Sequence, residues 1–361
     1  MNERSANYCV ILAGGTGRRL WPCSSKDKPK QFLDFFGVGR TLLQQTYDRF
    51  IKILPHENIY VSTFVGYVDL VKEQLPGVDD EHILAEPVQL STAPAVAWAT
   101  YHIASLNPNA NMIITPVDQM IINERCFLDE IIQGLDFVQR TPNFLTLAVK
   151  PTVPEKEYGY IQIGEEVSGG YGRVKSFTEK PDLEFARMFV SSGEFFWNTG
   201  VFLWNVQTML KSLADFIPNI AEKLENAERV ERHEEEQLFV REYYPSSMYL
   251  SIDLVILERN ENVFLKCGNF GWADIGSWTS LYEVLPKDED NNVVGNSQVI
   301  MRDCKNNIVN VPEGKVVVLQ GLEGYVLAEK GNVLVVCKND DPSLARRLVN
   351  EVQIKFGEEF A

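Results

Sequence analysis

The chain has 361 residues, of which 45% are hydrophobic and 23% charged, and its formal net charge is -16 at pH 7. That length predicts a large domain with a smaller one, and the apolar fraction is enough for a sizeable core. The negative charge argues against nucleic acid or an anionic membrane as a partner. No apolar run approaches the length of a membrane span. The six cysteines lack paired spacing, which predicts reduced thiols, a cytoplasmic protein and no zinc site.

The first predicted element is a buried strand, an apolar run at residues 8–13. Glycines at positions 14, 15 and 17 follow it, and they let the backbone turn sharply and bring its N–H groups close to a ligand. Five cations then stand against one acid, Asp27: Arg18, Arg19, Lys26, Lys28 and Lys30. This pattern favours a phosphate-binding loop. A plain glycine turn beside a solvated basic surface is the alternative.

Two familiar phosphate-binding loops do not fit these glycines. A dinucleotide-binding fingerprint needs a third glycine where this chain has Leu20, whose side chain would obstruct close helix packing. A Walker loop ends in Gly-Lys-Ser/Thr, which is absent here. The loop is therefore either another kind of phosphate site or the plain glycine turn, and a nicotinamide-dependent dehydrogenase is disfavoured.

Strands and helices alternate over the next hundred residues. Helices are predicted at 41–54, 67–75 and in an alanine-rich stretch ending at Leu106, and strands at 59–63, 83–86 and 112–115. This alternation predicts a Rossmann-like α/β fold with a mixed, mostly parallel sheet and helices on both faces. Such sheets bind ligands at the carboxyl ends of their strands. The glycine loop, the segment 86–92 and Asp118 all follow strand ends, so we expect them to form one site.

The pattern changes in the second half of the chain. Strands are predicted near residues 160, 174–179 and 197–202, and a highly charged helical segment at 218–244. A polar linker at 286–292 precedes short valine-rich runs, which predict a small C-terminal β module. A final helix begins after Asp341-Pro342. We therefore expect a large domain over residues 1–285 and a small β module with a terminal helix over 286–361.

The string from Cys9 to Phe32 resembles the signature of the sugar-1-phosphate nucleotidyltransferases, Gly-Gly-x-Gly-x-Arg-Leu-x-Pro followed by Pro-Lys. Its Leu-Trp-Pro and Pro-Lys-Gln-Phe segments are similar to those of mannose-1-phosphate guanylyltransferases. The resemblance covers nearly the whole chain, and it implies a β-helix-like form for the small C-terminal β module. It implies that residues 1–285 form a catalytic domain that transfers GMP from GTP to mannose 1-phosphate, with Mg²⁺ as cofactor and a homodimer as a plausible assembly. Some relatives continue into an isomerase domain for which this chain has no room, so only transferase activity is expected.

The resemblance also implies roles for individual residues. Arg19 would grip the nucleotide phosphates, Lys30 would neutralise charge around the α-phosphate, and Asp118 and Asp274 match the family's magnesium-binding aspartates. The matched nucleotide-binding positions are Leu12, Ala13, Gly14, Gly15, Gly17, Glu86, Thr92 and Pro116, and the matched sugar-phosphate contacts are Gly159, Glu179, Lys180 and Asn198. Each has a structural alternative, such as a surface cation, a helix-capping aspartate or an exposed ion pair of little energetic value.

Four positions depart from the expected guanylyltransferase pattern: Arg18, Leu90, Ser91 and Gln119. They bear on nucleotide and sugar choice more than on the type of reaction. The alternatives are therefore the same chemistry on another sugar 1-phosphate, such as a heptose, or a nucleotide-binding homologue without turnover.

Overall fold

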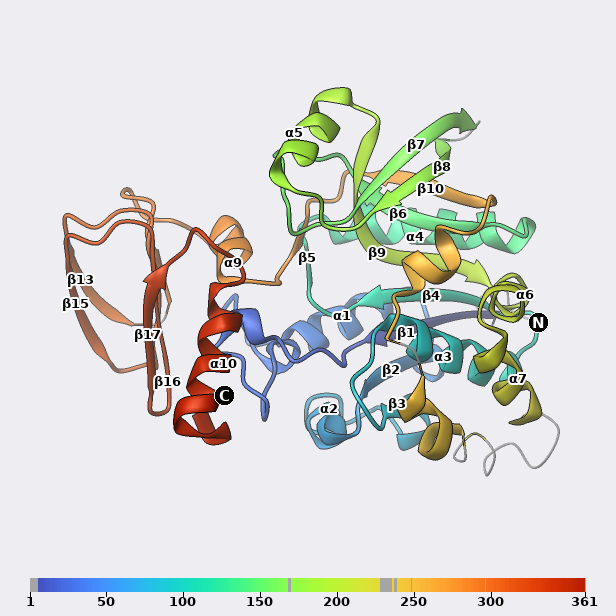
Figure 1. Ribbon diagram of the computed structural model, residues 1–361, viewed down its shortest axis with the longest axis horizontal. Helices are drawn as coiled ribbons and strands as arrows, with labels where there is room; N and C mark the ends of the chain where they lie inside the picture. The colour runs from blue at the N-terminus through green and yellow to red at the C-terminus, as the bar shows by residue number, and fades with distance from the viewer. Residues whose placement is uncertain are drawn as a thin grey trace. The chain divides into compact units, whose positions relative to one another are not determined.

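The structure is a computed structural model that describes residues 6–167, 170–227, 236, 239–247, 249–295 and 297–360 (Figure 1). The chain forms two compact units, each assembled from separate stretches of sequence. The sheet unit comprises Met1–Gly14, Thr46–Val117 and Ile121–Trp272, and the module unit comprises Gly15–Gln45, Asp118–Met120 and Ala273–Ala361. Most of the signature segment belongs to the same unit as the C-terminal module, and the division expected at residue 285 stays a prediction.

The sheet unit is built on a nine-stranded sheet with the order β3-β2-β1-β4-β9-β6-β10-β8-β7. Seven strands run in one direction, β8 and β9 run in the other, and β7 pairs with both β8 and β9. The seven are β1 (Asn7–Leu12), β2 (Ile59–Phe64), β3 (Ile83–Glu86), β4 (Asn111–Pro116), β6 (Phe144–Val149), β7 (Tyr160–Val167) and β10 (Val263–Gly268). The other two are β8 (Tyr171–Thr178) and β9 (Phe195–Asn205). The expected mixed α/β class is confirmed.

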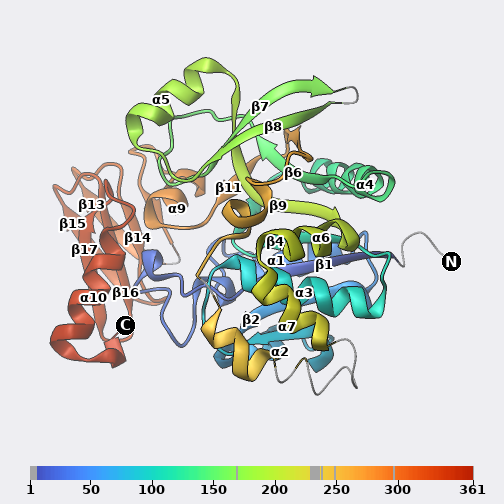
Figure 2. The same ribbon diagram turned by 45° about the vertical axis from the view of Figure 1, so that its right-hand side comes forward.

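Helices cover both faces of this sheet, as the alternation of side chains along the strands requires. On one face Phe202 and Trp204 of β9 join the buried cluster that includes α3 (Thr92–Leu106), α6 (Val206–Phe216) and α7 (Pro218–Ala227). On the other face Leu203 points at α4 (Glu124–Arg140), where a Cβ on Gly134 would lie 3.1 Å from it. Figure 2 shows α3, α6 and α7 together on one side of β1, β2 and β4. The unit also contains α2 (Val68–Gln74) and α5 (Leu183–Ser192).

The parallel strands bring several predicted site segments to the same edge of the sheet. β1, β3 and β4 end at Leu12, Glu86 and Pro116, and Asn198 at the start of β9 pairs with Ala148 near the end of β6. These ends share one edge of the sheet, and there Gln89 Nε2 of the 86–92 segment donates to the carbonyl of Gly14, the first residue of the glycine loop, at 2.9 Å.

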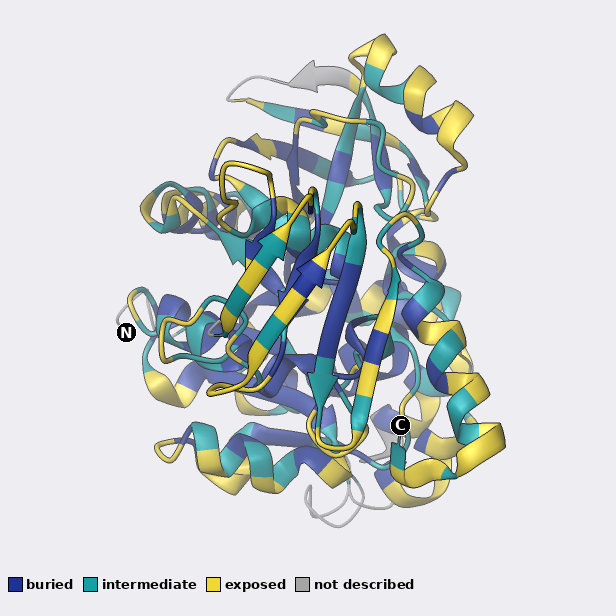
Figure 3. Ribbon diagram, turned by 90° about the vertical axis from the view of Figure 1, so that its left-hand side faces the viewer, coloured by how far each residue is buried: buried dark blue, intermediate teal, exposed yellow. Residues whose placement is uncertain are grey.

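The module unit contains a short coil of parallel strands. β12 (Val293–Val294), β14 (Ile308–Asn310) and β16 (Tyr325–Lys330) form one parallel set, and β13 (Gln298–Arg302) and β15 (Val316–Gln320) form another. β17 (Val333–Lys338) adds to β16 in the antiparallel sense, and α9 (Trp278–Val284) and α10 (Leu344–Phe356) complete the unit. Figure 3 shows how exposed and buried residues alternate along several of these strands.

Three elements contain points where the chain passes from one unit to the other: α1 (Leu42–Phe50), β5 (Gln119–Ile121) and β11 (Trp272–Asp274). The charged segment expected at 218–244 includes a run at residues 231–236, most simply a solvated face, of which the structure describes only Glu236. Glu236 Oε1 accepts a hydrogen bond from Trp98 Nε1 at 2.5 Å. Among the residues that the structure describes, no helix has the length and apolar character needed to cross a membrane.

Candidate functional site

The signature loop folds as part of the module unit. Gly17 has φ +64° and precedes the short 3-10 helix Arg18–Leu20, and a Cβ there would lie 2.3 Å from Ser24 Oγ. That conformation and that contact require glycine. Gly15 differs, because a Cβ added to it would meet nothing within 4 Å. Its carbonyl accepts a hydrogen bond from Gln31 Nε2 at 2.9 Å, which pins the loop to the Pro-Lys-Gln-Phe segment.

The two predicted cations and the two predicted metal ligands come together in this unit. Lys30 Nζ lies 2.5 Å from Asp118 Oδ2 and donates to the Ile275 carbonyl at 3.1 Å. The Ile275 N–H in turn donates to the Asp118 carbonyl at 2.8 Å. Arg19 and Asp274 approach one another over Gly276, where a Cβ would lie 2.7 Å from Arg19 Nη2 and 2.3 Å from Asp274 Oδ2. Groups far apart in sequence thus form one polar cluster.

Charge within this cluster keeps Asp118 ionised. Burial alone would raise its pKa, but the Lys30 ammonium, by its charge and its hydrogen bond, lowers the pKa below the ordinary value, and Arg19 adds to the effect. Lys30 is itself only 7% exposed, so its charge acts through little water. The cluster therefore presents ionised groups of both signs, an arrangement suited to phosphate and to a cation.

C-terminal residues brace the signature loop within the same unit. Trp21 packs with Val335 and Val349, and its Nε1 donates to the Phe360 carbonyl at 2.9 Å. Arg18 Nη1 donates to Asn350 Oδ1 at 2.9 Å. Arg18, one of the four departures from the family pattern, thus contacts the terminal helix. Sequence patterns gave no signal for this brace, because its partners lie more than three hundred residues apart.

The predicted nucleotide-binding residues of the sheet unit lie around Glu86. Its carboxylate is buried and accepts hydrogen bonds from Ser62 Oγ at 2.8 Å and Tyr244 OH at 2.6 Å. Burial raises the pKa of Glu86, and these two hydrogen bonds partly oppose the rise. A Cβ on Gly14 would lie 3.4 Å from Glu86 Oε1, so the carboxylate adjoins the glycine loop. Sequence reasoning missed Tyr244, which lies 158 residues further along the chain.

Two other side chains order the 86–92 segment. Gln89 Nε2 donates to the Gly14 carbonyl at 2.9 Å and to Tyr67 OH at 3.2 Å. Thr92 begins α3, and its Oγ1 accepts from the Ile252 N–H at 3.0 Å. The departures Leu90 and Ser91 precede this helix, and Gln119, the fourth, is buried at the start of β5. The sheet unit thus holds the 86–92 segment against the end of β1.

The predicted sugar-phosphate residues also gather in the sheet unit. The Asn198 N–H donates to the Gly159 carbonyl at 2.8 Å, and a Cβ on Gly159 would lie 3.1 Å from Glu179 Oε2. Lys180 Nζ lies 3.2 Å from Glu179 Oε1, in a half-exposed ion pair. Lys180 has φ +43°, a left-handed conformation that is uncommon outside glycine and that often marks a functional position. Asp253, which was not predicted, accepts from Asn198 Nδ2 at 2.8 Å.

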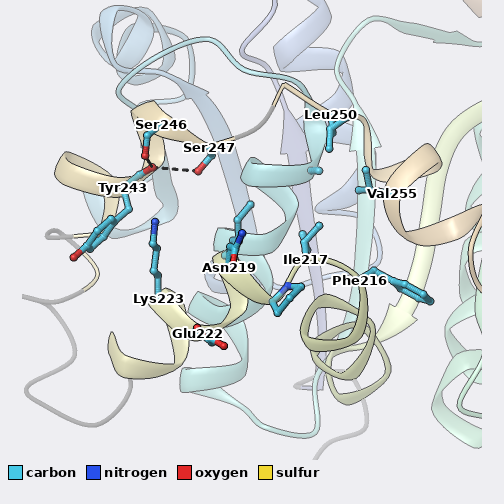
Figure 4. A pocket seen from close by; sticks show the side chains of 13 residues that line it. Phe216, Ile217, Asn219, Glu222, Lys223, Tyr243, Ser246, Ser247, Leu250 and Val255 are labelled. Atoms are coloured by element: carbon cyan, nitrogen blue, oxygen red, sulfur yellow. Dashed lines mark hydrogen bonds between the residues drawn. The ribbon is translucent and has the colours of Figure 1, made fainter.

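A separate cavity of about 360 Å³ lies elsewhere in the sheet unit (Figure 4). Its apolar lining residues include Ile217, Leu250 and Val255. Lys223 and Tyr243 also line it, and Lys223 Nζ lies 4.4 Å from the centre of the Tyr243 ring. None of the predicted site residues lines it. The site is therefore argued from the polar clusters above and not from this cavity.

The fold and these clusters define a phosphate-handling α/β protein: a mostly parallel sheet, a glycine loop after its first strand, and a buried lysine beside an ionised aspartate. The Nucleotidyl transferase family matches residues 8–291. The chain belongs to this family, and the resemblance found in its sequence is confirmed. It is therefore a member of an enzyme family.

Similar proteins agree with this assignment. The xanthan biosynthesis protein XanB of Xanthomonas campestris is 32% identical over 95% of this chain and 73% of its own length. A mannose-1-phosphate guanylyltransferase of Klebsiella pneumoniae is 32% identical over 92% of this chain and 70% of its own length. A Thermus thermophilus crystal structure, described as a mannose-1-phosphate geranyltransferase, has a TM-score of 0.86 and 29% identity, covering 96% of this chain and 99% of that one.

Proposed function

We propose that this protein transfers GMP from GTP to mannose 1-phosphate, giving GDP-mannose and pyrophosphate. The single observation that carries the proposal is the cluster of Arg19, Lys30, Asp118 and Asp274, the four positions to which the family resemblance assigns phosphates and a cation. The name of the similar Klebsiella protein, a mannose-1-phosphate guanylyltransferase, supports the sugar and the nucleotide. Membership of the nucleotidyl transferase family supports the reaction type.

In this reaction a phosphate oxygen of mannose 1-phosphate attacks the α-phosphorus of GTP. A new P–O bond forms there, the bond from the α-phosphorus to the bridging oxygen of the β-phosphate breaks, and that oxygen leaves with pyrophosphate. The nucleophile is already an anion, so no general base has to remove a proton. The protein must instead align two anions that repel one another and neutralise the charge that gathers at the α-phosphate.

Lys30 and Arg19 supply that positive charge. Lys30 is held by Asp118 and by the Ile275 carbonyl, so its ammonium is oriented before the substrate arrives and needs little reorganisation during the reaction. Arg19 offers a planar fork of donors that suits the nucleotide phosphates. Gly15 has open space where a side chain would be, which lets its backbone approach a phosphate closely.

Asp118 and Asp274 fit a divalent cation by their donor chemistry. Carboxylate oxygens are the ligands that Mg²⁺ prefers, and one or two suffice when phosphate oxygens and water complete the shell. The Lys30 ammonium already neighbours Asp118 Oδ2 and helps to hold the pKa of that carboxyl low, which supports an ionised, cation-binding oxygen. When bound, the ion would supply charge neutralisation at the phosphates.

The sugar phosphate is assigned to Gly159, Glu179, Lys180 and Asn198. Glu179 provides acceptors for hydroxyls, Asn198 provides both kinds of hydrogen-bonding group, and Lys180 provides a cation for the sugar's phosphate. The guanine and ribose are assigned to the strand-end residues Leu12, Ala13, Gly14, Glu86, Thr92 and Pro116. Gly14 adjoins Glu86 and Gln89, which supports their grouping.

A homodimer is part of the proposal. Apolar residues stand exposed along β13, β15 and β17, among them Val316 at 65% and Val318 at 67%. β13 and β15 pair with one another, and exposed valine and isoleucine side chains on paired strands are typical of a surface that a second copy covers. Sedimentation of the wild type and of a Val316→Lys, Val318→Lys variant tests this: the wild type should sediment as a dimer and the variant as a monomer.

The activity is tested by measuring pyrophosphate release with each of GTP, UTP, ATP and dTTP, paired with mannose, glucose or heptose 1-phosphate, with and without Mg²⁺. We expect turnover with GTP and mannose 1-phosphate that depends on the cation. Turnover only with another pair would replace the proposed substrates, and no turnover with any pair would favour a binding homologue.

A further inference from the structure

Asp253 carries a carboxylate that lies beside the assigned sugar contacts and has no role in the reaction as proposed. Asp253 begins a π-helix, Asp253–Leu257, whose last three residues are buried in the core of the sheet unit. The residue before it, Ile252, is also buried, and its N–H is bonded to Thr92. The segment is thus anchored on both sides of Asp253, so the position of the carboxylate is fixed by the fold.

The carboxylate of Asp253 controls the orientation of an amide. Its Oδ1 accepts a hydrogen bond from Asn198 Nδ2 at 2.8 Å. At the other end of the amide, Asn198 Oδ1 accepts from the Gly200 N–H at 3.0 Å, and Gly200 has φ +70°. Together these bonds determine which end of the amide faces which way. An amide has two N–H donors and two acceptor lone pairs, so one of each is left to meet a ligand hydroxyl.

The same amide belongs to the assigned hexose contacts. The backbone of Asn198 is bonded to Gly159, and the position where a Gly159 Cβ would stand is 3.1 Å from Glu179 Oε2 and 3.4 Å from Asn198 Cβ. Burial raises the pKa of Asp253, the Asn198 hydrogen bond opposes that rise, and the Glu179 carboxylate adds to it. The hydrogen bond therefore couples the Asp253 carboxylate to the Asn198 amide, and the charge of Glu179 acts on the same carboxylate.

We propose that Asp253 is a positioning residue for sugar recognition: it holds the Asn198 amide in the orientation that distinguishes the hydroxyl configuration of the hexose. This inference rests on the proposed function. A hydroxyl both donates and accepts, so an amide that cannot rotate accepts one hydroxyl geometry better than another. Ser251 also belongs to this arrangement: its Oγ accepts the Leu254 N–H at 3.4 Å, and its hydrogen bond to the Asp253 carboxylate helps to lower the pKa of Asp253.

The test compares Asp253→Ala with Asp215→Ala, a matched change at an exposed position of α6. Asp253→Ala should raise the KM for mannose 1-phosphate roughly tenfold, as expected when a buried hydrogen-bonding group loses its partner. The KM for GTP and the thermal midpoint should change little. The preference for mannose over glucose 1-phosphate in kcat/KM should fall. Asp253→Asn keeps an acceptor for Asn198 and should restore most of the mannose 1-phosphate affinity, whereas Asp215→Ala should behave as the wild type.

A double-mutant cycle with Asn198→Ala separates positioning from general damage. If Asp253 acts through Asn198, adding Asp253→Ala to Asn198→Ala should change KM for the sugar phosphate less than about twofold, so the effects are far from additive. Additive effects, or equal losses for both substrates, would overturn the proposal. Should Asp253→Ala not fold, Asp253→Glu displaces the acceptor by one methylene, and an unchanged sugar KM in that folded variant would also overturn it. Wild type that turns over no sugar phosphate would sink the proposed function instead.

Discussion

Lys30 Nζ lies 2.5 Å from Asp118 Oδ2, and the same ammonium reaches the Ile275 carbonyl at 3.1 Å. Two acceptors therefore fix the nearly buried ammonium of Lys30. One of them is the carboxylate of Asp118, which the family resemblance assigns to a divalent cation. Lys30 therefore contributes to the stability of the fold as well as to the proposed reaction, since its removal leaves the Asp118 carboxylate without its positive partner. Any variant at Lys30 must be measured for stability and for activity together.

Replacing Lys30 with alanine should lower kcat by roughly 10²–10³-fold, the usual cost of losing one preorganised charge-stabilising group. The KM for GTP should change less than kcat, because the charge that Lys30 neutralises grows in the transition state. Pyrophosphate release in single-turnover conditions measures the effect. Urea unfolding should give a loss of stability of about 3 kcal/mol, because the partner carboxylate stays partly buried without its cation.

Lys26→Ala is the matched control for this prediction. Lys26 belongs to the same basic segment, but its ion pair with Glu358 is exposed on both sides. Exposed pairs contribute little, so the control should keep the stability and turnover of the wild type. A Lys30→Ala protein that is as active as the Lys26→Ala protein would remove Lys30 from the proposed machinery.

The buried carboxyl of Glu86 should make stability depend on pH. Burial raises its pKa in the folded state, whereas in the unfolded chain the value is about 4.3. Between those two values the folded state binds more protons than the unfolded state, so the free energy of unfolding falls as the pH rises. The stabilisation is complete below the unfolded pKa and is lost once the pH passes the folded one.

Urea unfolding of the wild type and of Glu86→Gln at steps from pH 4 to pH 8 checks this. The glutamine cannot ionise, so the fall seen in the wild type should be absent in the variant. An exposed residue of α5, Glu184, supplies the control, and Glu184→Gln should retain the wild-type pH dependence. Parallel pH curves for the wild type and Glu86→Gln would show that Glu86 titrates as an ordinary glutamate.

The strand ends were readable from the sequence, and the partners of the site were not. The expected strand at 83–86 coincides with β3, because a short apolar run with a polar end leaves a local pattern. Contacts such as Asn198 with Asp253 and Glu86 with Tyr244 join different elements, and one such contact leaves no periodic trace in the sequence. The family resemblance singled out Lys30 and Asp118, but the ion pair between them is seen only in the structure.

The domain boundary expected at residue 285 likewise rests on local sequence patterns alone. A polar linker at 286–292 marks a change in composition, so the sequence favours an independent domain over residues 1–285. The packing of Trp21 with Val335 and Val349 is a tertiary contact that no local composition reveals. In the structure the signature loop shares a compact unit with the C-terminal module.

A chain ending at residue 285 distinguishes these two views of the domain. It lacks the Val335, Val349 and Phe360 partners of Trp21 and the Asn350 partner of Arg18. We expect it to lose turnover and to be cut by trypsin within the signature loop, because the loop would lose its buried contacts. The intact Asn350→Ala protein, which loses only an exposed hydrogen bond, should resist cleavage. A fully active truncated chain would instead support an independent catalytic domain.

The glycines of the signature loop allow ligand contact to be separated from folding. Gly17 needs its left-handed backbone and has no room for a Cβ, so Gly17→Ala should destabilise the protein by roughly 1–3 kcal/mol. Gly15 has neither constraint, since a Cβ there meets no atom within 4 Å. Gly15→Ala should therefore unfold at the wild-type urea concentration yet bind GTP roughly tenfold more weakly, because the added methyl group stands where a phosphate would approach the backbone.

Gly77→Ala, in a turn that is equally open, should alter neither property. Titration of GTP against the three variants, alongside urea unfolding, gives both measurements. Unimpaired GTP binding by Gly15→Ala would mean that the loop turns beside the phosphates without touching them.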